Sequence, residues 1–230
     1  ATLDTHAVDR YLRVGLLLGF EPAPADFSFP IPEAAERRAG ALLAEHGIGA
    51  APESRFVLLA PGSAWETKRW TAERFAAVAR HVLDRGLPVV LIGSGKDRLA
   101  CRAVAERAPG VADLCGRTAL TELAAIVRRA AVVVTNDSGP MHLAAALGRP
   151  TVSMFGPTDP LWIGPYGQPD AVISAELSCA PCYLRQLRRC PHGHACMYGL
   201  APEEVIARIE RALAPAEARP AARRIASAGE

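Results

Sequence analysis

The stretch AVVVTNDSGPMHLAAALGRPTVSMF, residues 131–155, decides the fold of this chain. It begins with a nearly pure apolar run, Ala131 to Thr135, and passes through polar residues into a predicted helix from Gly139 to Leu147. A second apolar run, Pro150 to Phe155, follows. Short apolar runs are typical of strands that are buried on both faces. A helix between two such runs predicts a parallel βαβ unit.

The same alternation extends to both sides of this unit. Further strands are predicted at 56–60, 88–92 and 111–114. Further helices are predicted at 71–83, with Thr71 as N-cap, and at 97–107, 121–129 and 202–213. Strands that alternate with amphipathic helices are built from βαβ units. We therefore predict an α/β fold with a Rossmann-like, doubly wound parallel sheet.

The two ends of the chain differ from this central part. Apolar residues at helical spacing predict a helix within the first twenty residues. Four prolines between Glu21 and Pro32 predict an extended linker, and a second helix is predicted from Glu33 to His46. We expect a helical and linker segment at 1–50, a Rossmann-like domain at 51–214 with a cysteine-rich insert at 177–199, and a flexible tail at 215–230.

The overall composition excludes several classes of protein. A formal net charge of +2 is too near neutral to indicate a nucleic-acid-binding protein. Apolar runs stay far below the ~18 residues that span a bilayer. Asp4, His6 and Asp9 stand where a signal peptide would carry basic residues. The sequence therefore predicts a cytoplasmic protein, with attachment to a membrane surface left open.

Three predicted strands are followed by loops with unusual chemistry. The loop at 61–70 combines a Gly-Ser turn with Lys68, which offers a point charge to a phosphate. The loop at 135–142 places Asn, Asp, Ser and His around a helix start, where free N–H groups bind anions. The loop at 93–97 is the weakest of the three, since small residues are common in βα turns. The alternatives are a solvated loop, simple helix caps and a structural histidine at 142.

Together these residues resemble the heptosyltransferases of glycosyltransferase family 9. The resemblance covers Arg55 to Leu213, and its most specific element is Asp-Ser-Gly-Pro-Met-His at 137–142. The other matching elements are Pro61-Gly62-Ser63, Lys68, Trp70, Gly93-Ser94 with Asp97, Cys115-Gly116 and Phe155-Gly156-Pro157-Thr158. The cysteine segment looks more like the second heptosyltransferase of the family than the first. The resemblance implies a GT-B fold, in which two Rossmann-like domains face each other and the C-terminal one binds the nucleotide sugar.

The resemblance also implies a role for individual residues. Ser63 and Lys68 would hold the diphosphate of ADP-heptose, Asp97 would face the nucleoside, and Thr118 would lie beside the adenine. Asp137, Ser138 and Gly139 would line the sugar and phosphate pocket, with His142 close behind. The full donor-binding set is Ser63, Lys68, Gly93, Ser94, Asp97, Thr118, Asp137, Ser138, Gly139, Pro140, Met141 and His142. The implied reaction is inverting transfer of heptose to the lipopolysaccharide inner core, without a required cofactor or metal.

One feature of the family is not found in this sequence. Family enzymes carry an N-terminal acceptor domain with the aspartate proposed as general base, and residues 6–12 resemble only the end of that domain. The catalytic base is therefore unknown, and we expect the chain to bind donor without transferring sugar by itself. Peripheral association with the inner membrane stays open.

Six cysteines raise the question of a metal. Cys101 and Cys115 lie in apolar surroundings and are expected to be core residues. The remaining four, Cys179, Cys182, Cys190 and Cys196, have the spacing C-x2-C-x7-C-x5-C, which offers four ligands to a structural zinc ion. The spacing is irregular for a zinc ribbon, so reduced thiols are the favoured interpretation and zinc is the alternative. Arg185, Arg188 and Arg189 make the same loop basic, suited to an anionic acceptor or simply solvated.

Three other functions compete with this hypothesis. A non-catalytic nucleotide-binding module fits the missing acceptor domain, and a zinc-binding adaptor fits the cysteines. A Rossmann oxidoreductase is disfavoured because no G-x-G-x-x-G follows a first strand. A UDP- or GDP-sugar donor also stays open, as do the exact acceptor and the oligomeric state.

Overall fold

A six-stranded, fully parallel sheet forms the centre of the computed structural model, which describes residues 5–21, 23–49 and 55–214. The strand order is β3-β2-β1-β4-β5-β6. The strands are β1 (Val57–Ala60), β2 (Val89–Leu91), β3 (Ala112–Asp113), β4 (Val132–Asn136), β5 (Thr151–Phe155) and β6 (Val172–Ser174). This is the order of a doubly wound Rossmann sheet, so the predicted fold class is confirmed.

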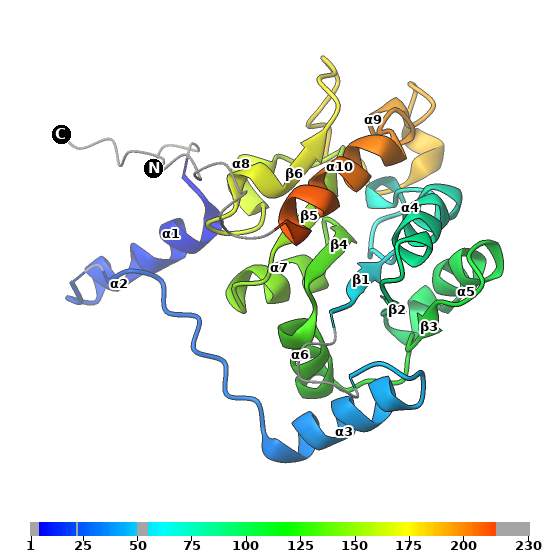
Figure 1. The fold of residues 1–230 in the computed structure, drawn as a ribbon. Helices are drawn as coiled ribbons and strands as arrows, with labels where there is room; N and C mark the ends of the chain where they lie inside the picture. Colours follow the sequence, from blue (N-terminus) through cyan, green and yellow to red (C-terminus); the bar gives the residue numbers. More distant parts are fainter. Residues whose placement is uncertain (1–4, 22, 50–54, 215–230) are drawn as a thin grey trace.

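Helices cover both faces of the sheet, as Figure 1 shows. Helices α4 (Ala72–Asp84), α5 (Arg98–Arg107) and α10 (Pro202–Leu213) pack on one face, and α3 (Glu33–Ala44), α6 (Leu120–Arg129) and α7 (Gly139–Ala146) on the other. Strand β1 contributes to both layers, with Val57 and Leu59 in the first core and Leu58 in the second. Because side chains alternate across a strand, a strand buried on both faces must be apolar throughout.

Most predicted elements lie within a few residues of the observed ones, and the differences are local. The helix predicted in the first twenty residues is divided into α1 (Ala7–Leu12) and α2 (Val14–Leu17). The prediction missed β6 and the four-residue helices α8 (Pro160–Ile163) and α9 (Ala195–Tyr198). It also missed the short 3-10 helices η1 (Glu66–Lys68), η2 (Gly95–Asp97), η3 (Pro169–Ala171) and η4 (Leu187–Arg189). Elements this short are set by tertiary contacts, because they carry too few residues for a periodic pattern.

Helix α3 packs into the core of the layered domain. Its residues Ala39, Leu42 and Leu43 are buried in the core that also contains residues of α6 and of the strands. The predicted boundary at residue 50 therefore separates elements that share one core. The idea that 1–50 resembles the end of an acceptor domain stays a prediction, and the predicted tail at 215–230 lies outside the described residues.

Helices α1 and α2 lie to one side of the sheet, with α1 nearer to α8 and α2 farther out (Figure 1). The hydroxyl of Tyr166 donates a hydrogen bond of 2.6 Å to Asp9, and Nε2 of His6 lies 3.0 Å from the carbonyl oxygen of Gly164. The Arg10 guanidinium lies over the Trp162 ring, 5.0 Å from its centroid. A few polar and aromatic contacts thus hold α1, and much of its apolar surface stays exposed.

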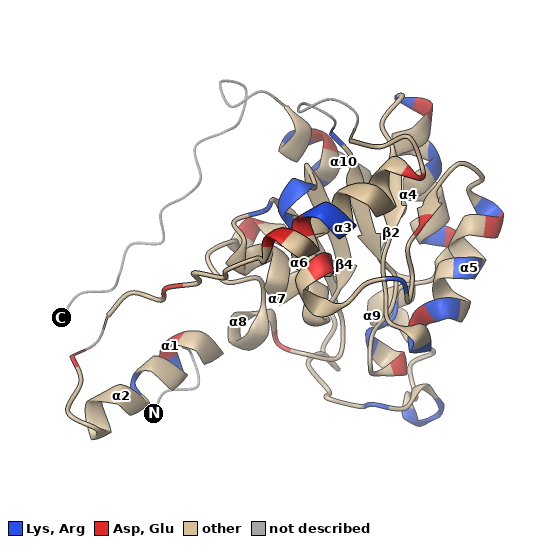
Figure 2. Ribbon diagram, turned by 90° about the horizontal axis from the view of Figure 1, so that it is seen from below, with Lys and Arg blue, Asp and Glu red and all other residues tan. Residues whose placement is uncertain are grey.

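Charged residues lie on the outer helices and loops, while the strands of the sheet are almost free of them (Figure 2). This distribution is expected when parallel strands are covered by helices on both faces. Among the described residues, no helix is long and apolar enough to cross a membrane.

Replacing Thr71 by alanine should lower the free energy of unfolding by about 1 kcal/mol. The Thr71 hydroxyl accepts a hydrogen bond from the backbone N–H of Arg74 and so caps α4, as the sequence predicted. Urea unfolding of Thr71→Ala and Thr71→Ser measures the effect, because serine keeps the hydroxyl. If Thr71→Ser lost as much unfolding free energy as Thr71→Ala, the capping hydrogen bond would not be the cause of the loss.

Candidate functional site

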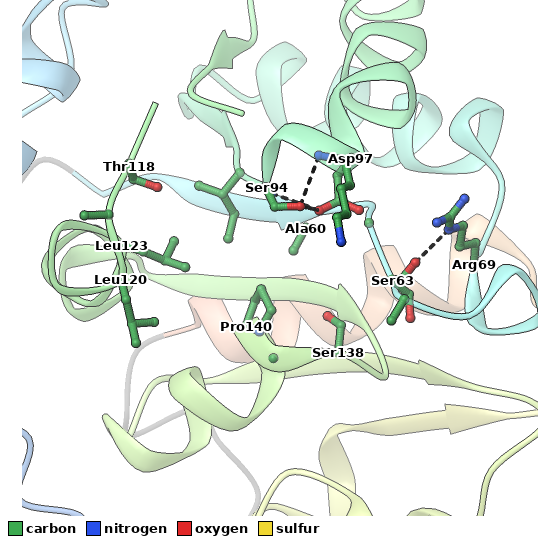
Figure 3. Close-up of a pocket in the computed structure, with 17 residues that line it drawn as sticks. Ala60, Ser63, Arg69, Ser94, Asp97, Thr118, Leu120, Leu123, Ser138 and Pro140 are labelled. Carbon is green, nitrogen blue, oxygen red and sulfur yellow. Dashed lines mark hydrogen bonds between the residues drawn. The ribbon is translucent and has the colours of Figure 1, made fainter. Parts of the chain in front are cut away.

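A cavity of about 490 Å³ opens at the carboxyl edge of the sheet. Strands β1 and β4 are neighbours, and the chain that follows each of them crosses to a different face of the sheet. The cavity lies at this switch point, which is where open α/β sheets bind ligands. The loops after β1, β2 and β4 line it together with the start of α6 (Figure 3). Its walls are formed by Ala60, Gly62, Ser63, Ala64, Arg69, Ile92, Gly93, Ser94, Lys96, Asp97, Thr118, Ala119, Leu120, Leu123, Ser138, Gly139 and Pro140.

The cavity brings together eight of the twelve predicted donor-binding residues. These eight are Ser63, Gly93, Ser94, Asp97, Thr118, Ser138, Gly139 and Pro140. The other four, Lys68, Asp137, Met141 and His142, do not line it. Residues separated by more than seventy positions along the chain meet here because parallel strands end at one edge of the sheet.

Strand β2 is followed by a tightly closed loop. The Asp97 carboxylate accepts hydrogen bonds from the backbone N–H of Ser94, at 2.9 Å, and from its hydroxyl, at 2.7 Å. A side chain at Gly62 would collide with the Asp97 carboxyl group, and one at Gly93 would lie 2.9 Å from its Cβ. These two glycines therefore allow the loops after β1 and β2 to approach each other.

Strand β4 ends in a residue that fixes the neighbouring loop. The buried Asn136 side chain accepts from the backbone N–H of Trp70 at 3.0 Å and donates to the carbonyl of Pro61 at 2.9 Å. Asn136 thus closes the 61–70 loop over the end of β4. Ser138 occupies the N-cap position of α7, but its hydroxyl contacts Thr135 at 3.0 Å and makes no cap bond. The alternative that Ser138 is simply a capping side chain is wrong.

Lys68 forms a nearly buried ion pair. Its ammonium lies 2.6 Å from the Asp137 carboxylate, whose side chain is 4% exposed, and Thr158 donates a second hydrogen bond of 2.7 Å to the same oxygen. The ammonium also lies 4.2 Å from the centroid of Trp65. Lys68 was expected to offer a free positive charge to a phosphate, but its ammonium is paired with Asp137. The reason is that β1 and β4 are adjacent, which places Lys68 opposite Asp137.

Met141 and His142 lie outside the lining of the cavity and differ from each other in their surroundings. Met141 is fully buried in the domain core. His142 is exposed beside the ion pair. Desolvation by the surrounding protein lowers the pKa of His142, against the opposing effect of Asp137, while His6 and Lys68 lower it further. The lowered pKa favours the neutral form of this imidazole.

The cavity contains residues that the sequence analysis did not select. Arg69 and Lys96 bring positive charge, and the exposed Leu120 and half-buried Leu123 form an apolar wall. Arg69 is held by a hydrogen bond of 2.8 Å from its Nε to the carbonyl of Ser63 (Figure 3). The adjacency of Arg69 to Lys68 could have indicated it. No feature of the sequence marks Leu120, an exposed leucine at a helix start, as a residue that lines a cavity.

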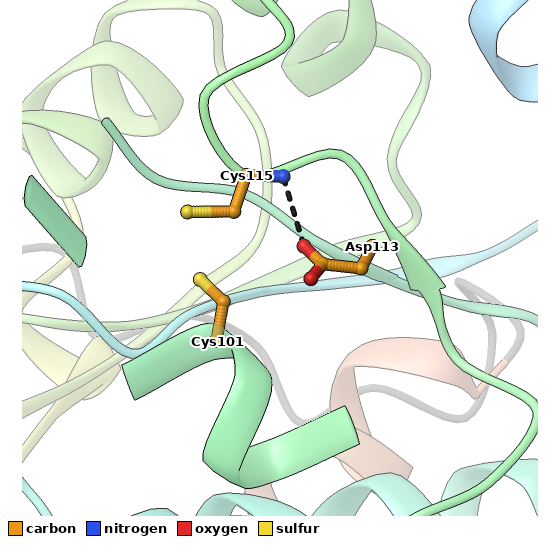
Figure 4. A group of neighbouring side chains, drawn as sticks. All are labelled: Cys101, Asp113 and Cys115. Carbon is orange, nitrogen blue, oxygen red and sulfur yellow. Dashed lines mark hydrogen bonds between the residues drawn. The ribbon is translucent and has the colours of Figure 1, made fainter. Parts of the chain in front are cut away.

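Cys101 and Cys115 are buried behind the loop after β2, as core residues were expected to be. With Asp113 they form a group whose ligand atoms lie within 4.8 Å of one another (Figure 4). Both thiols donate to main-chain carbonyls, Cys101 to Ile92 at 3.6 Å and Cys115 to Ser94 at 3.2 Å. Burial raises the pKa of both thiols, which keeps them protonated.

The other four cysteines surround one separate cavity of about 140 Å³. The segment that carries them lies against the 66–68 turn. The hydroxyl of Thr67 donates to the carbonyl of Leu184, and Nε2 of His194 lies 2.6 Å from the carbonyl of Thr67. The cysteine-rich segment therefore supports the loop that carries Lys68.

Comparison with known proteins gives one consistent family. The family model described as glycosyltransferase family 9 (heptosyltransferase) matches residues 1–191. Lipooligosaccharide heptosyltransferase 2 of Campylobacter jejuni is 32% identical over 165 residues, which cover 68% of this chain and 51% of the relative. The chain thus spans about half the length of such curated relatives.

Solved structures agree with the family match. The crystal structure of a family 9 glycosyl transferase from Veillonella parvula superimposes with a TM-score of 0.77 at 29% identity, over 91% of this chain and 60% of that one. An Escherichia coli heptosyltransferase solved with ADP-2-deoxy-2-fluoro heptose has a TM-score of 0.57 at 22% identity, over 84% and 51% of the two chains. The second likeness shows the shared fold alone. On the family match over residues 1–191, this chain belongs to glycosyltransferase family 9.

Proposed function

We propose that this chain supplies the donor-binding half of a glycosyltransferase that moves heptose from ADP-heptose to the lipopolysaccharide inner core. The observation that carries the proposal is the cavity at the switch point of the sheet, with positive groups at one side and an apolar wall at the other. A nucleoside diphosphate sugar has the matching polarity, since its diphosphate is anionic and its base is flat and largely apolar.

The anionic part of the donor has a defined place in this proposal. Ser138, Gly139 and Pro140 at the start of α7 line the cavity, and no side chain caps this end of the helix. The dipole of a helix start favours an anion, although Pro140 offers no N–H here and the Met141 N–H donates to the carbonyl of Ser138. Arg69 and Lys96 add positive charge from two other loops. Lys68 would act next to them, through the ion pair with Asp137, where the sugar is expected.

The nucleoside part would lie toward α6. Only one oxygen of the Asp97 carboxylate is occupied by Ser94, and the other is available to a ribose hydroxyl. Leu120, Leu123 and Thr118 form the opposite wall, which would receive the base. The proximity of a carboxylate acceptor to an apolar wall supports a nucleoside in this orientation.

The catalytic steps remain with the other half of the enzyme in this proposal. The known relatives extend over about twice the length that this chain matches, and a general base has to reach the acceptor hydroxyl. This chain would bind the donor and stabilise the departing diphosphate in an inverting transfer. The second candidate is a nucleotide-binding module without transferase activity of its own, since the cavity accounts for nucleotide binding and not for transfer. Cytoplasmic location and contact with the inner membrane stay predictions.

Calorimetric titration with ADP, UDP and GDP tests the proposal. We expect saturable binding of ADP and weaker binding of UDP and GDP. An assay of the chain with ADP-heptose and a heptose-free core acceptor then separates the two candidates, because a binding module forms no product. Equal affinity for all three nucleotides would contradict ADP as the donor nucleotide, and absence of binding would contradict the whole proposal.

Replacing Leu120 by alanine should weaken ADP binding about fivefold, or ~1 kcal/mol. Leu120 lines the cavity but is 66% exposed, so the variant removes apolar contact with the base at little cost to the fold. Leu99→Ala is the matched control, because Leu99 is 83% exposed on α5 and outside the cavity. Unchanged affinity of Leu120→Ala would place the base elsewhere.

A further inference from the structure

Four cysteine side chains meet in the segment 177–199. Cys179, Cys182, Cys190 and Cys196 line a single cavity of about 140 Å³, together with His192. The four cysteines therefore border one cavity, although they are separated by two, seven and five residues along the chain.

The surroundings of this cavity favour thiolate ligands. Residues 177–199 contain no aspartate or glutamate, but they contain Arg185, Arg188 and Arg189. A centre of four thiolates and one divalent ion carries a charge of −2, which suits a segment whose only formal charges are positive. The backbone N–H of His194 donates to Sγ of Cys190 at 3.4 Å. Such N–H···S bonds stabilise sulfur that carries negative charge.

The segment has little core of its own to hold it in place. Its regular structure is limited to the three residues of η4 and the four residues of α9. Between residues 177 and 199, the buried apolar side chains are those of Cys196 and Met197. Segments with so few buried apolar residues generally need a disulfide or a metal to be ordered.

We propose that Cys179, Cys182, Cys190 and Cys196 bind one thiophilic metal ion, zinc or iron, in a tetrahedral site. Four sulfur ligands in this geometry select these two metals. Binding releases the four thiol protons and forms four metal–sulfur bonds of about 2.3 Å. The sulfurs are more widely spaced than the group of Cys101, Asp113 and Cys115, so the ion would draw them inward into the cavity.

The group of Cys101, Asp113 and Cys115 is the competing location for a metal. Its two thiols already donate to the carbonyls of Ile92 and Ser94, and both cysteines are buried in the core. The four-cysteine cavity has free space and exposed access at Cys182. The observations therefore favour the segment 177–199.

The position of this centre assigns it a structural role. Three contacts join the segment to the 66–68 turn, from Thr67 to Leu184, from His194 to Thr67 and from the backbone N–H of Leu187 to Glu66. The metal would keep the segment in the shape that makes these contacts. Through them it would position the loop that carries Lys68.

Metal analysis of the purified chain tests the site directly. The protein is expressed in minimal medium supplemented with zinc in one arm and iron in the other, and its metal content is measured by mass spectrometry. We expect roughly one ion per chain in at least one arm. Iron bound by thiolates absorbs visible light and zinc does not, which identifies the ion. Cys182→Ser should lower the content at least about tenfold, and the exposed position of Cys182 limits damage to the fold.

Cys115→Ala is the matched control and should keep the metal content of the wild type. Loss of metal in Cys115→Ala but not in Cys182→Ser would move the site to the other cluster and overturn the proposal, as would a metal-free wild type in both arms. Hydrogen exchange tests the structural role without any ligand. Faster exchange at residues 61–70 in Cys182→Ser is expected, and unchanged exchange in a metal-free variant would overturn the role of the metal in holding that loop.

Discussion

Lys68→Ala is expected to lower the free energy of unfolding by about 3 kcal/mol, because it leaves a buried carboxylate without its counter-charge. Asp137 is 4% exposed and Lys68 12% exposed, so water can replace little of the lost interaction. Thr158 remains as a hydrogen-bond donor to Asp137 but brings no charge. Urea unfolding of Lys68→Ala beside the wild type measures the loss. The double variant Lys68→Met with Asp137→Asn should recover part of it, since neither partner is then charged.

The same substitution should weaken ADP binding about thirtyfold, or ~2 kcal/mol, because the Asp137 carboxylate would then stand uncompensated beside the cavity-lining Ser138 and repel the diphosphate. Lys96→Ala is the matched control. Lys96 lines the cavity, its side chain is exposed, and it has no ion-pair partner among the described residues. Its loss should weaken ADP binding but change stability by less than ~0.5 kcal/mol. If Lys68→Ala binds ADP like the wild type, Arg69 and Lys96 hold the diphosphate without it.

Gly62→Ala is expected to lower stability by about 2 kcal/mol and ADP affinity about tenfold or more. The added methyl group would collide with the Asp97 carboxyl group, which caps Ser94. The collision forces the loops after β1 and β2 apart at the point where both line the cavity. Thermal unfolding and calorimetric titration with ADP measure the two effects.

Gly95→Ala provides the comparison for this prediction. A Cβ at Gly95 would meet no atom within 4 Å, although the residue lies in the loop after β2 that carries Asp97. We expect its stability and affinity to stay close to those of the wild type. Wild-type behaviour of Gly62→Ala would show that Asp97 moves aside freely and does not position the nucleoside.

The sequence predicted the cavity better than it predicted the contacts within it. Ser94, Asp97 and Ser138 line the cavity because they follow strands, and strand ends can be read from apolar runs. Lys68 also follows a strand, yet its ammonium is bound by Asp137. That contact depends on β1 and β4 being neighbours, and strand order is not encoded in any local pattern. Leu120 was missed for a similar reason, since only the fold places an exposed leucine at a ligand cavity.

The four cysteines of segment 177–199 show the same limit of prediction from local sequence patterns. Their spacing along the chain is irregular for a zinc ribbon, so the sequence favoured reduced thiols. The fold places Cys179 and Cys196 at one cavity although sixteen residues separate them. A metal site is defined by the positions of ligand atoms in space, and the chain between the ligands can take any path that satisfies them.

The sequence by itself determined the α/β class, the doubly wound sheet, the family and the loops that form the cavity, because apolar periodicity and loop composition act over a few neighbouring residues. Only the tertiary structure decided the pairing of Lys68 with Asp137, the closure of the 61–70 loop by Asn136, and the convergence of the four cysteines. The packing of α3 into the core is of the same kind. These features arise where segments distant in sequence meet, and such meetings follow from the order of the strands and from packing in three dimensions.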